Sequence, residues 1–289
     1  MTFNLYSFAK ATRAFTLATT CLFASVCTLS AITITVPGDQ ATIAAGIAAA
    51  NPGDVVQLTA NISEALVTIN KAITLDGAGF TLTSTSPNWG VNVAVAGVTI
   101  QNLTVTGAST FGIITSCNAD NLTVSNTTVT GCGGSGFALN GSDNLSLTDI
   151  TSTNNVGNGV SITDCNNVTI TGLTTSGNMF AGGFSAGVGI FSSGSSCPPA
   201  GTTNVTITGT VSIGEPIPVY EEVTAGSITG TSLPASLTTH FVGVATGAKF
   251  YTANLADAYT LAASLIAPPS SISPTLIHVE EISSGNKYV

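Results

Sequence analysis

Charge is what this sequence lacks most. Only 7% of its 289 residues are charged, against about a quarter in ordinary soluble domains. Helical bundles line their exposed faces with charged side chains, so an all-helical fold is excluded. Positive charge is scarcer still, because five Lys and Arg residues stand against 14 Asp and Glu. A net charge of −9 provides no basic surface for a phosphate backbone, which excludes nucleic acid as a partner.

Residues 1–31 have the order of a secretory signal. Lys10 and Arg13 precede an apolar stretch that ends in small residues around Ser30 and Ala31. No other segment is long and apolar enough to span a bilayer. We therefore expect a secreted or cell-surface protein without a membrane span after the signal is removed. The chain that follows contains no arginine, and its lysines are Lys71, Lys249 and Lys287.

Repeats are abundant. Six similar segments start 25, 24, 23, 23 and 37 residues apart, and a period in the twenties is typical of stacked coils. The long last interval contains one ordinary coil and an insertion, residues 178–203. The copies are AITLDGAGFTLT from Ala72, GVTIQNLTVTG from Gly97, NLTVSNTTVTG from Asn121, NLSLTDITSTN from Asn144, NVTITGLTTSG from Asn167 and NVTITGTVSIG from Asn204.

Each copy alternates as a strand does, with two apolar residues on one face. These pairs predict one continuous apolar ladder: Ile73 and Leu75, Val98 and Ile100, Leu122 and Val124, Leu145 and Leu147, Val168 and Ile170, and Val205 and Ile207. The corner positions that follow are Gly77, Asn102, Asn126, Asp149, Gly172 and Gly209, residue types that enter the left-handed backbone region at low cost. A second short run and a glycine-led third run complete each copy. The pattern predicts an all-β fold, a parallel β-helix of about six regular coils.

The repeats and the segment from Pro37 to Gly79 resemble secreted right-handed parallel β-helix proteins of the pectate-lyase-like superfamily. In that superfamily a short amphipathic helix caps the cylinder, and a strand ending in a Pro-Gly-Asp turn leads into the coils. Residues Thr42 to Ala50, Asn51 to Asp54 and Ile69 to Gly77 match these pieces in order. The resemblance covers residues 32–214 and implies the fold and an N-terminal capping helix, while leaving the activity open.

The chain divides into four parts. Residues 1–31 are the predicted signal, residues 32–71 the N-terminal cap and first strands, and residues 72–214 the coils. Residues 215–289 form a linker and a C-terminal segment with a predicted helix capped by Asn254 and a predicted strand, TLIHVEEI. Because a helix followed by a strand repeats the order of the N-terminal cap, we expect the start of a truncated second β-helix there.

No catalytic residue carries over from the resemblance. Pectate-lyase-like enzymes use an Arg or Lys base with calcium-binding carboxylates, or paired Asp residues with Arg, His or Lys. Here residues 32–214 contain a single lysine, Lys71, and no histidine precedes His240. A non-catalytic protein is therefore expected, with a polysaccharide lyase or hydrolase as the alternative.

Asp120 and Asp143 form the one stacked carboxylate pair among the coils. They lie 23 residues apart, one coil, which predicts a separation of about 4.8 Å. The simplest interpretation is that both accept backbone N–H bonds at a corner. A calcium site is the alternative, and no other cofactor or metal motif occurs in the sequence.

Aromatic residues indicate a ligand site. Phe180 and Phe184 lie on the glycine-rich insertion, and Trp89, the only tryptophan, lies in the turn SPNWG. Exposed rings stack on the apolar faces of sugars, while hydroxyl and amide groups supply hydrogen bonds. The partner predicted is an extracellular polysaccharide or cell-surface glycan. The function expected is glycan binding or a surface and adhesive structural role.

Threonines occupy the outward positions of the predicted strands, which favour β-branched side chains whatever the function. Their regular spacing also resembles the ice-binding faces of β-helical antifreeze proteins, a second alternative function. The first outward array contains Thr99 and Gln101, Thr123 and Ser125, Ser146 and Thr148, Thr169 and Thr171, and Thr206 and Thr208. The next strand adds Thr104 and Thr106, Thr128 and Thr130, Thr151 and Thr153, and Thr174 and Ser176.

Four cysteines follow the signal: Cys117, Cys132, Cys165 and Cys197. Cys165 precedes the ladder Asn167 by two residues and Cys197 precedes Asn204 by seven, which places both near one corner on adjacent coils. One coil step of about 4.8 Å suits the roughly 4.4–6.8 Å Cα separation of a disulfide. We therefore predict a Cys165 to Cys197 bridge, with four free thiols as the alternative.

Overall fold

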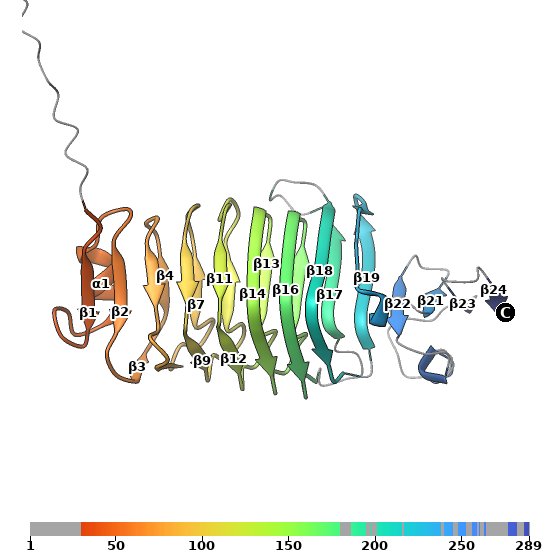
Figure 1. The fold of residues 1–289 in the computed structure, drawn as a ribbon, viewed down its shortest axis with the longest axis horizontal. Helices are drawn as coiled ribbons and strands as arrows, with labels where there is room; N and C mark the ends of the chain where they lie inside the picture. Colours follow the sequence, from red (N-terminus) through yellow and green to blue (C-terminus); the bar gives the residue numbers. More distant parts are fainter. Residues whose placement is uncertain are drawn as a thin grey trace, which may run out of the picture. The chain divides into compact units, whose positions relative to one another are not determined.

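The computed structural model describes residues 30–179, 186–194, 197, 201–215, 217–237, 240–244, 248–252, 256–258, 260, 263, 277–281 and 286–288. Residues 31–289 form one compact unit. Within the described residues, strands from Val55 to Ala225 wind into seven coils (Figure 1). The sequence predicted about six, and the seventh is the coil in front of Ala72, which the repeat alignment did not include.

The first four coils have three short strands each. Their strands are β2 (Val55–Leu58), β3 (Ile62–Glu64) and β4 (Val67–Ile69); β5 (Thr74–Asp76), β6 (Thr81–Ser84) and β7 (Val91–Val93); β8 (Thr99–Gln101), β9 (Thr104–Thr106) and β10 (Ile113–Thr115); β11 (Thr123–Ser125), β12 (Thr128–Thr130) and β13 (Phe137–Asn140). In the last three coils one long strand runs through a corner. These coils are β14 (Asp143–Thr153) and β15 (Val160–Thr163), β16 (Asn166–Ser176) and β17 (Ala186–Ser193), and β18 (Thr202–Ile213) and β19 (Ile217–Ala225).

Parallel pairing between successive coils builds three faces. Face one contains β1 (Thr33–Val36), β2, β5, β8, β11, the first halves of β14, β16 and β18, and β20 (Ile228–Thr229). Face two contains β3, β6, β9, β12 and the second halves of β14, β16 and β18, while face three contains β4, β7, β10, β13, β15, β17 and β19. The predicted all-β parallel β-helix is confirmed.

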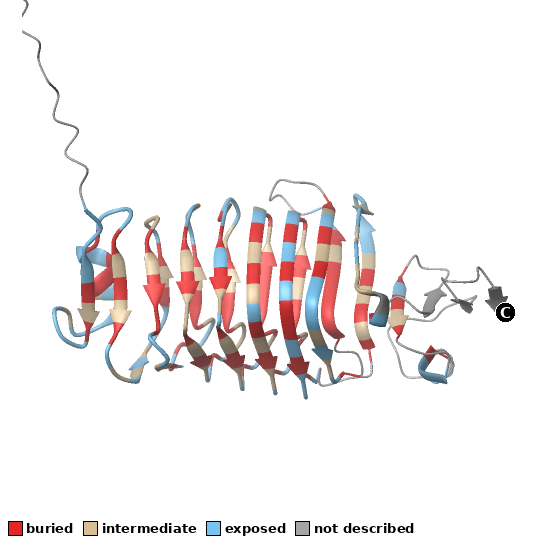
Figure 2. Cartoon of the chain, in the orientation of Figure 1, coloured by how far each residue is buried: buried red, intermediate tan, exposed pale blue. Residues whose placement is uncertain are grey.

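The predicted apolar ladder fills the interior. All of its members, from Ile73 and Leu75 to Val205 and Ile207, are at most 2% exposed, and Figure 2 shows the alternation of buried and exposed residues along the strands. In the register, Val124 pairs with Ile100 on one side and Leu147 on the other. Each coil therefore adds its apolar side chains to the same columns, which is how a chain with so few charges buries a continuous core.

Corner residues adopt the left-handed backbone that was predicted, with one exception. Asn102, Asn126, Asp149, Gly172 and Gly209 have φ between 48° and 76°. The prediction for Gly77 was wrong, because Ala78 (φ 49°) and Gly79 (φ 86°) take that conformation. A Cβ on Gly77 would lie 2.5 Å from Leu103 Cα, so glycine is required there by the close approach of the next coil.

A second corner carries a column of asparagine amides. Asn144 Nδ2 donates to Asn121 Oδ1 (3.4 Å), Asn167 Nδ2 to Asn144 Oδ1 (3.1 Å) and Asn204 Nδ2 to Asn167 Oδ1 (2.9 Å). All four residues have positive φ, between 54° and 58°. Asparagine suits this corner for two reasons. It tolerates the left-handed backbone, and its side-chain amide forms a hydrogen bond with the equivalent asparagine of the next coil.

Helix α1 (Ile43–Ala49) caps the first coil, as predicted, between caps at Thr42 and Ala50. Glu64 on β3 accepts hydrogen bonds from Ile43 N (2.8 Å) and Ala44 N (3.0 Å) at the start of the helix. At the other end Lys71 Nζ donates to the carbonyls of Ala48 and Ala50, both at 2.7 Å. The two charges complement the helix dipole and satisfy backbone groups that the helix itself leaves open.

The C-terminal segment continues face three with antiparallel strands. β22 (Lys249–Thr252) pairs with β19, and β21 (His240–Val244), β23 (Ile277–Glu281) and β24 (Asn286–Tyr288) follow, with a short helix η1 (Ala235–Leu237) before them. The predicted strand is confirmed in β23. Of the predicted helix after Asn254, only residues 256–258, 260 and 263 are described, and they are helical. A second β-helix stays a prediction. Among the described residues, no helix is long and apolar enough to cross a membrane.

Replacing Lys71 with Met should destabilise the protein by about 1–2 kcal/mol, because two carbonyls at the end of α1 lose a charged donor. Lys71→Arg, which keeps the charge, should recover part of the loss. Chemical denaturation measures both. Equal stability of Lys71→Met and the natural protein would mean that the hydrogen bonds from Lys71 to the end of α1 do not stabilise the fold.

Asn144 allows the two roles of the corner asparagine to be separated. Asn144→Gly removes the amide and keeps an easy left-handed backbone, whereas Asn144→Ala also strains the backbone. The alanine variant should therefore be less stable than the glycine variant by about 1 kcal/mol. Equal unfolding midpoints for the two variants would mean that backbone strain is unimportant at this corner.

Candidate functional site

Of the three residues of the predicted aromatic site, the structure describes only Trp89. Phe180 and Phe184 lie outside the described residues. Trp89 is half-buried at the corner between faces two and three, and its indole Nε1 is buried without a hydrogen-bond partner. The aromatic site of Trp89, Phe180 and Phe184 therefore stays a prediction.

Phe111 is a ring that the sequence reasoning missed. It occupies the same corner as Trp89 on the next coil, since Gly90 N donates to Phe111 O (2.9 Å) and Thr110 N donates to Asn88 O (2.7 Å). Both rings are half-buried. The signal was present in the sequence, because each ring directly precedes the glycine that leads a strand of face three.

Apolar side chains recur at this corner two coils after Phe111, beyond a coil that has Gly133, Gly134 and Ser135 there. Val156 is 43% exposed and Met179 is 71% exposed. Met179 N donates to Asn155 O (2.8 Å), which places Val156 and Met179 on adjacent coils at equivalent positions. We name Trp89, Phe111, Val156 and Met179 the apolar corner. Exposed apolar side chains that gather along one edge are typical of a contact surface.

Asp120 and Asp143 stack at a corner as predicted. Asp143 N donates to Asp120 Oδ1 at 2.7 Å, so Asp120 makes the corner-capping contact that the simpler interpretation expected of both residues. Asp143 Oδ1 is buried and has no hydrogen-bond partner. Among the described residues no group of three His, Cys, Asp or Glu side chains is placed to hold a metal ion. The calcium site stays a prediction.

Other carboxylates are engaged by the scaffold. Asp54 accepts bonds from the backbone N–H groups of Ile32 (3.0 Å) and Asn51 (2.8 Å), and these bonds lower the pKa of its carboxyl. Comparable contacts hold Asp39 against Thr35, Asp76 against Gln57 and Asn102, Asp164 against Ser193, and Glu222 against Tyr220. A carboxylate used in this way is oriented for the fold and is less available for acid or base chemistry.

A buried polar column crosses three coils below Met179. Asn155 Nδ2 donates to Asn178 Oδ1 (2.9 Å), and Asn178 Nδ2 donates to Glu215 Oε1 (2.6 Å). Thr175 Oγ1 donates to the other oxygen of Glu215 at 2.5 Å. Glu215 is 5% exposed, so this carboxylate also serves the interior, where a buried polar group needs such partners.

Aromatic rings and carboxylates gather where β19 meets β22. Tyr220 packs between two rings, edge-on to Phe191 (centroids 5.8 Å apart) and tilted against Phe250 (4.8 Å). Tyr220 Oη donates to Glu222 Oε2 (2.8 Å), and burial together with this carboxylate raises the pKa of the phenol. Buried Glu221 pairs with Lys249 at 3.5 Å. Stacking and ion pairing here fasten the antiparallel strands to the last coil.

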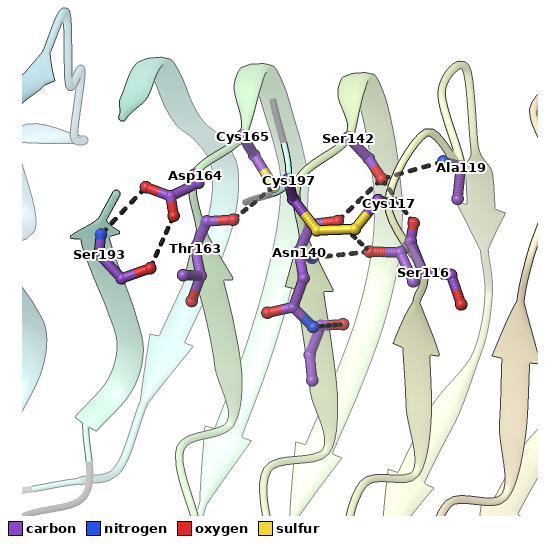
Figure 3. The surroundings of a disulfide bond; sticks show 12 residues. Ser116, Cys117, Ala119, Asn140, Ser142, Thr163, Asp164, Cys165, Ser193 and Cys197 are labelled. Atoms are coloured by element: carbon purple, nitrogen blue, oxygen red, sulfur yellow. Dashed lines mark hydrogen bonds between the residues drawn. A yellow bond between two sulfur atoms is a disulfide. The ribbon is translucent and has the colours of Figure 1, made fainter. Parts of the chain in front are cut away.

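The predicted Cys165 to Cys197 disulfide is wrong. Cys197 is bonded to Cys117, with their Cα atoms 5.5 Å apart, and Cys165 is a buried free thiol (Figure 3). The position next to Cys165 in the following coil belongs to Thr202, whose Oγ1 accepts from Cys165 N at 3.3 Å. The Cys165 side chain is fully buried, and its Sγ donates to Thr163 O at 3.3 Å.

The connection that carries Cys197 explains the error. It runs from residue 194 to residue 201, whereas the preceding corners between faces three and one take two residues each, 141–142 and 164–165. Cys197 lies over Gly141, two coils back, because a Cβ on Gly141 would lie 3.1 Å from Cys197 Sγ. The regular coil step assumed in the prediction therefore does not apply to Cys197, which lies beside Gly141 and not one step from Cys165.

A family model described as the right-handed β-helix region matches residues 42–212, more than half of the chain. The match spans helix α1 and the coils as far as β18. It supports the resemblance stated from the sequence at the level of fold. No curated protein and no solved structure matches the chain.

Thiol labelling tests the cysteine assignment. Burial raises the pKa of Cys165 to about 12 and also raises that of Cys132, so both thiols stay protonated at neutral pH. Iodoacetamide at pH 8 should leave both unmodified in the folded protein and modify both after unfolding without reductant. Peptide mapping should recover Cys117 joined to Cys197, and a Cys165 to Cys197 peptide would contradict the structure.

Proposed function

The chain belongs to the right-handed β-helix family, and we propose that within it this protein is a secreted, non-catalytic β-helix. Its role is to bind an extracellular glycan or to serve as a surface and adhesive structural module. The observation that carries the proposal is the use of ionisable groups. The one lysine of the coils clamps α1, and most described coil carboxylates bind the scaffold.

A polysaccharide lyase or hydrolase needs an ionisable pair that is free to reach substrate. Lys71 Nζ is 2.7 Å from two helix carbonyls, and moving it to a substrate would leave both without their donor. The stacked pair Asp120 and Asp143 is joined by the hydrogen bond from Asp143 N to Asp120, and within the described part of the chain neither carboxylate forms an ion pair. These contacts favour binding over bond cleavage.

The outer surface supports a neutral glycan as the ligand. Its polar groups are hydroxyls and amides, and the net charge of −9 repels acidic polysaccharides. The apolar corner supplies two rings, Trp89 and Phe111, on adjacent coils. Rings at successive coils suit successive sugars of a chain, because each ring stacks on the apolar face of one sugar.

Binding of the mature protein to an array of neutral and acidic glycans tests the proposal. Trp89→Ala and Phe111→Ala should each weaken binding about 2- to 12-fold if their rings stack on sugar. Phe191→Ala, on face three beside Tyr220, is the matched control and should leave affinity unchanged.

A product assay on the same polysaccharides addresses the alternative. Reducing ends or unsaturated uronates released at enzymatic rates would contradict the non-catalytic role. Equal loss of binding in all three variants would remove the apolar corner from the site.

A further inference from the structure

Face two is the most regular outer surface of the coils. Five consecutive coils, with strands β6, β9, β12, β14 and β16, each present a pair of outward hydroxyls at the same two positions. The first column contains Thr81, Thr104, Thr128, Thr151 and Thr174, and the second contains Thr83, Thr106, Thr130, Thr153 and Ser176. We name these ten residues the hydroxyl array.

The pairing places the array members directly opposite one another. Thr128 pairs with Thr104 and Thr151, and Thr130 pairs with Thr106 and Thr153. Thr153 Oγ1 donates to Thr130 Oγ1 at 3.1 Å, so hydroxyls within a column come within hydrogen-bonding reach. Nine of the ten residues are threonine, whereas face one is interrupted by Asp76, Gln101, Ser125 and Ser146 at equivalent positions.

A surface with two repeat distances best fits a ligand that has the same two. Along a column the residue positions repeat about every 4.8 Å, and across the two columns they repeat about every 6.7 Å, two residues of a strand. Within this spacing the hydroxyls of Thr130 and Thr153 turn toward each other. Tetrahedral water with O···O of about 2.75 Å has second neighbours about 4.5 Å apart and a layer repeat of about 7.3 Å. Both distances agree with the array to within about a tenth, which threonine rotamers can absorb.

The chemistry of the array also separates water from other ligands. It contains no charge and no aromatic ring, so neither ionic ligands nor stacked sugars have their usual contacts. Threonine offers a hydroxyl that hydrogen-bonds water and a methyl group that water must surround. We propose that the hydroxyl array of face two binds ordered water at the surface of ice, a function beyond the glycan binding proposed above.

Ice recrystallisation and thermal hysteresis of the mature protein test this inference. The natural protein should inhibit recrystallisation, and Thr128→Tyr, at the centre of the array, should lose that effect because the ring breaks the plane. Thr123→Tyr is the matched control, since it lies on face one of the same coil. It should retain the effect. Thermal melts establish that both variants are folded.

Three results would overturn the inference. One is a folded natural protein without effect on ice, and another is equal loss in Thr123→Tyr and Thr128→Tyr. The third is a double result: the natural protein adsorbs to a crystalline polysaccharide and Thr128→Tyr does not, while neither the natural protein nor either variant affects ice growth. Glycan binding through Trp89 and Phe111 is measured separately, so failure here leaves the proposed function standing.

Discussion

Parallel backbone pairing between successive coils is the constraint on which the rest of the molecule depends. Because each strand pairs in register with the equivalent strand of the next coil, one residue type at one position becomes a column. Columns of valine, leucine and isoleucine make the core, and the asparagine column closes one corner through hydrogen bonds of 2.9–3.4 Å between side-chain amides. The same register aligns the threonines of face two. Core, corners and outer faces are thus three results of a single coil step.

The few charged side chains serve mainly to hold the stacked coils together. Glu64 and Lys71 hold the helix on the first coil. At another corner Asp76 accepts a hydrogen bond from the side-chain amide of Asn102. Glu215 ends the buried polar column that begins at Asn155. A charge in these positions satisfies backbone or amide groups that would otherwise be left open at an end or a corner. The surface that remains is poor in charged groups and rich in hydroxyls, which accounts for proposing a binding role rather than a catalytic one.

The columns were predictable from the sequence, because the alternation of apolar residues and the spacing of Asn121, Asn144 and Asn167 repeat with every coil. Features that depend on a single irregular segment were not. Cys197 lies beside Gly141 and not one coil step from Cys165, and two extra residues in the corner between Asp76 and Thr81 move the left-handed backbone from Gly77 to Ala78 and Gly79. Phe111 was missed because aromatic residues occupy this position on only two coils, which is too few for a repeat to be recognised. A sequence repeat predicts the features that all coils share and does not predict the features of a single coil.

A distance between two distant array positions tests the coil step most directly. Spin labels on cysteines introduced at Thr81 and Thr174, four coils apart by the register, should report Cα atoms about 19 Å apart, four steps of about 4.8 Å. The buried Cys132 and Cys165 and the bonded Cys117 and Cys197 would remain unlabelled. A narrow distribution at this distance is the result expected. A broad distribution, or one centred several coil steps longer, would contradict the stacked register and with it the columns that the account derives from it.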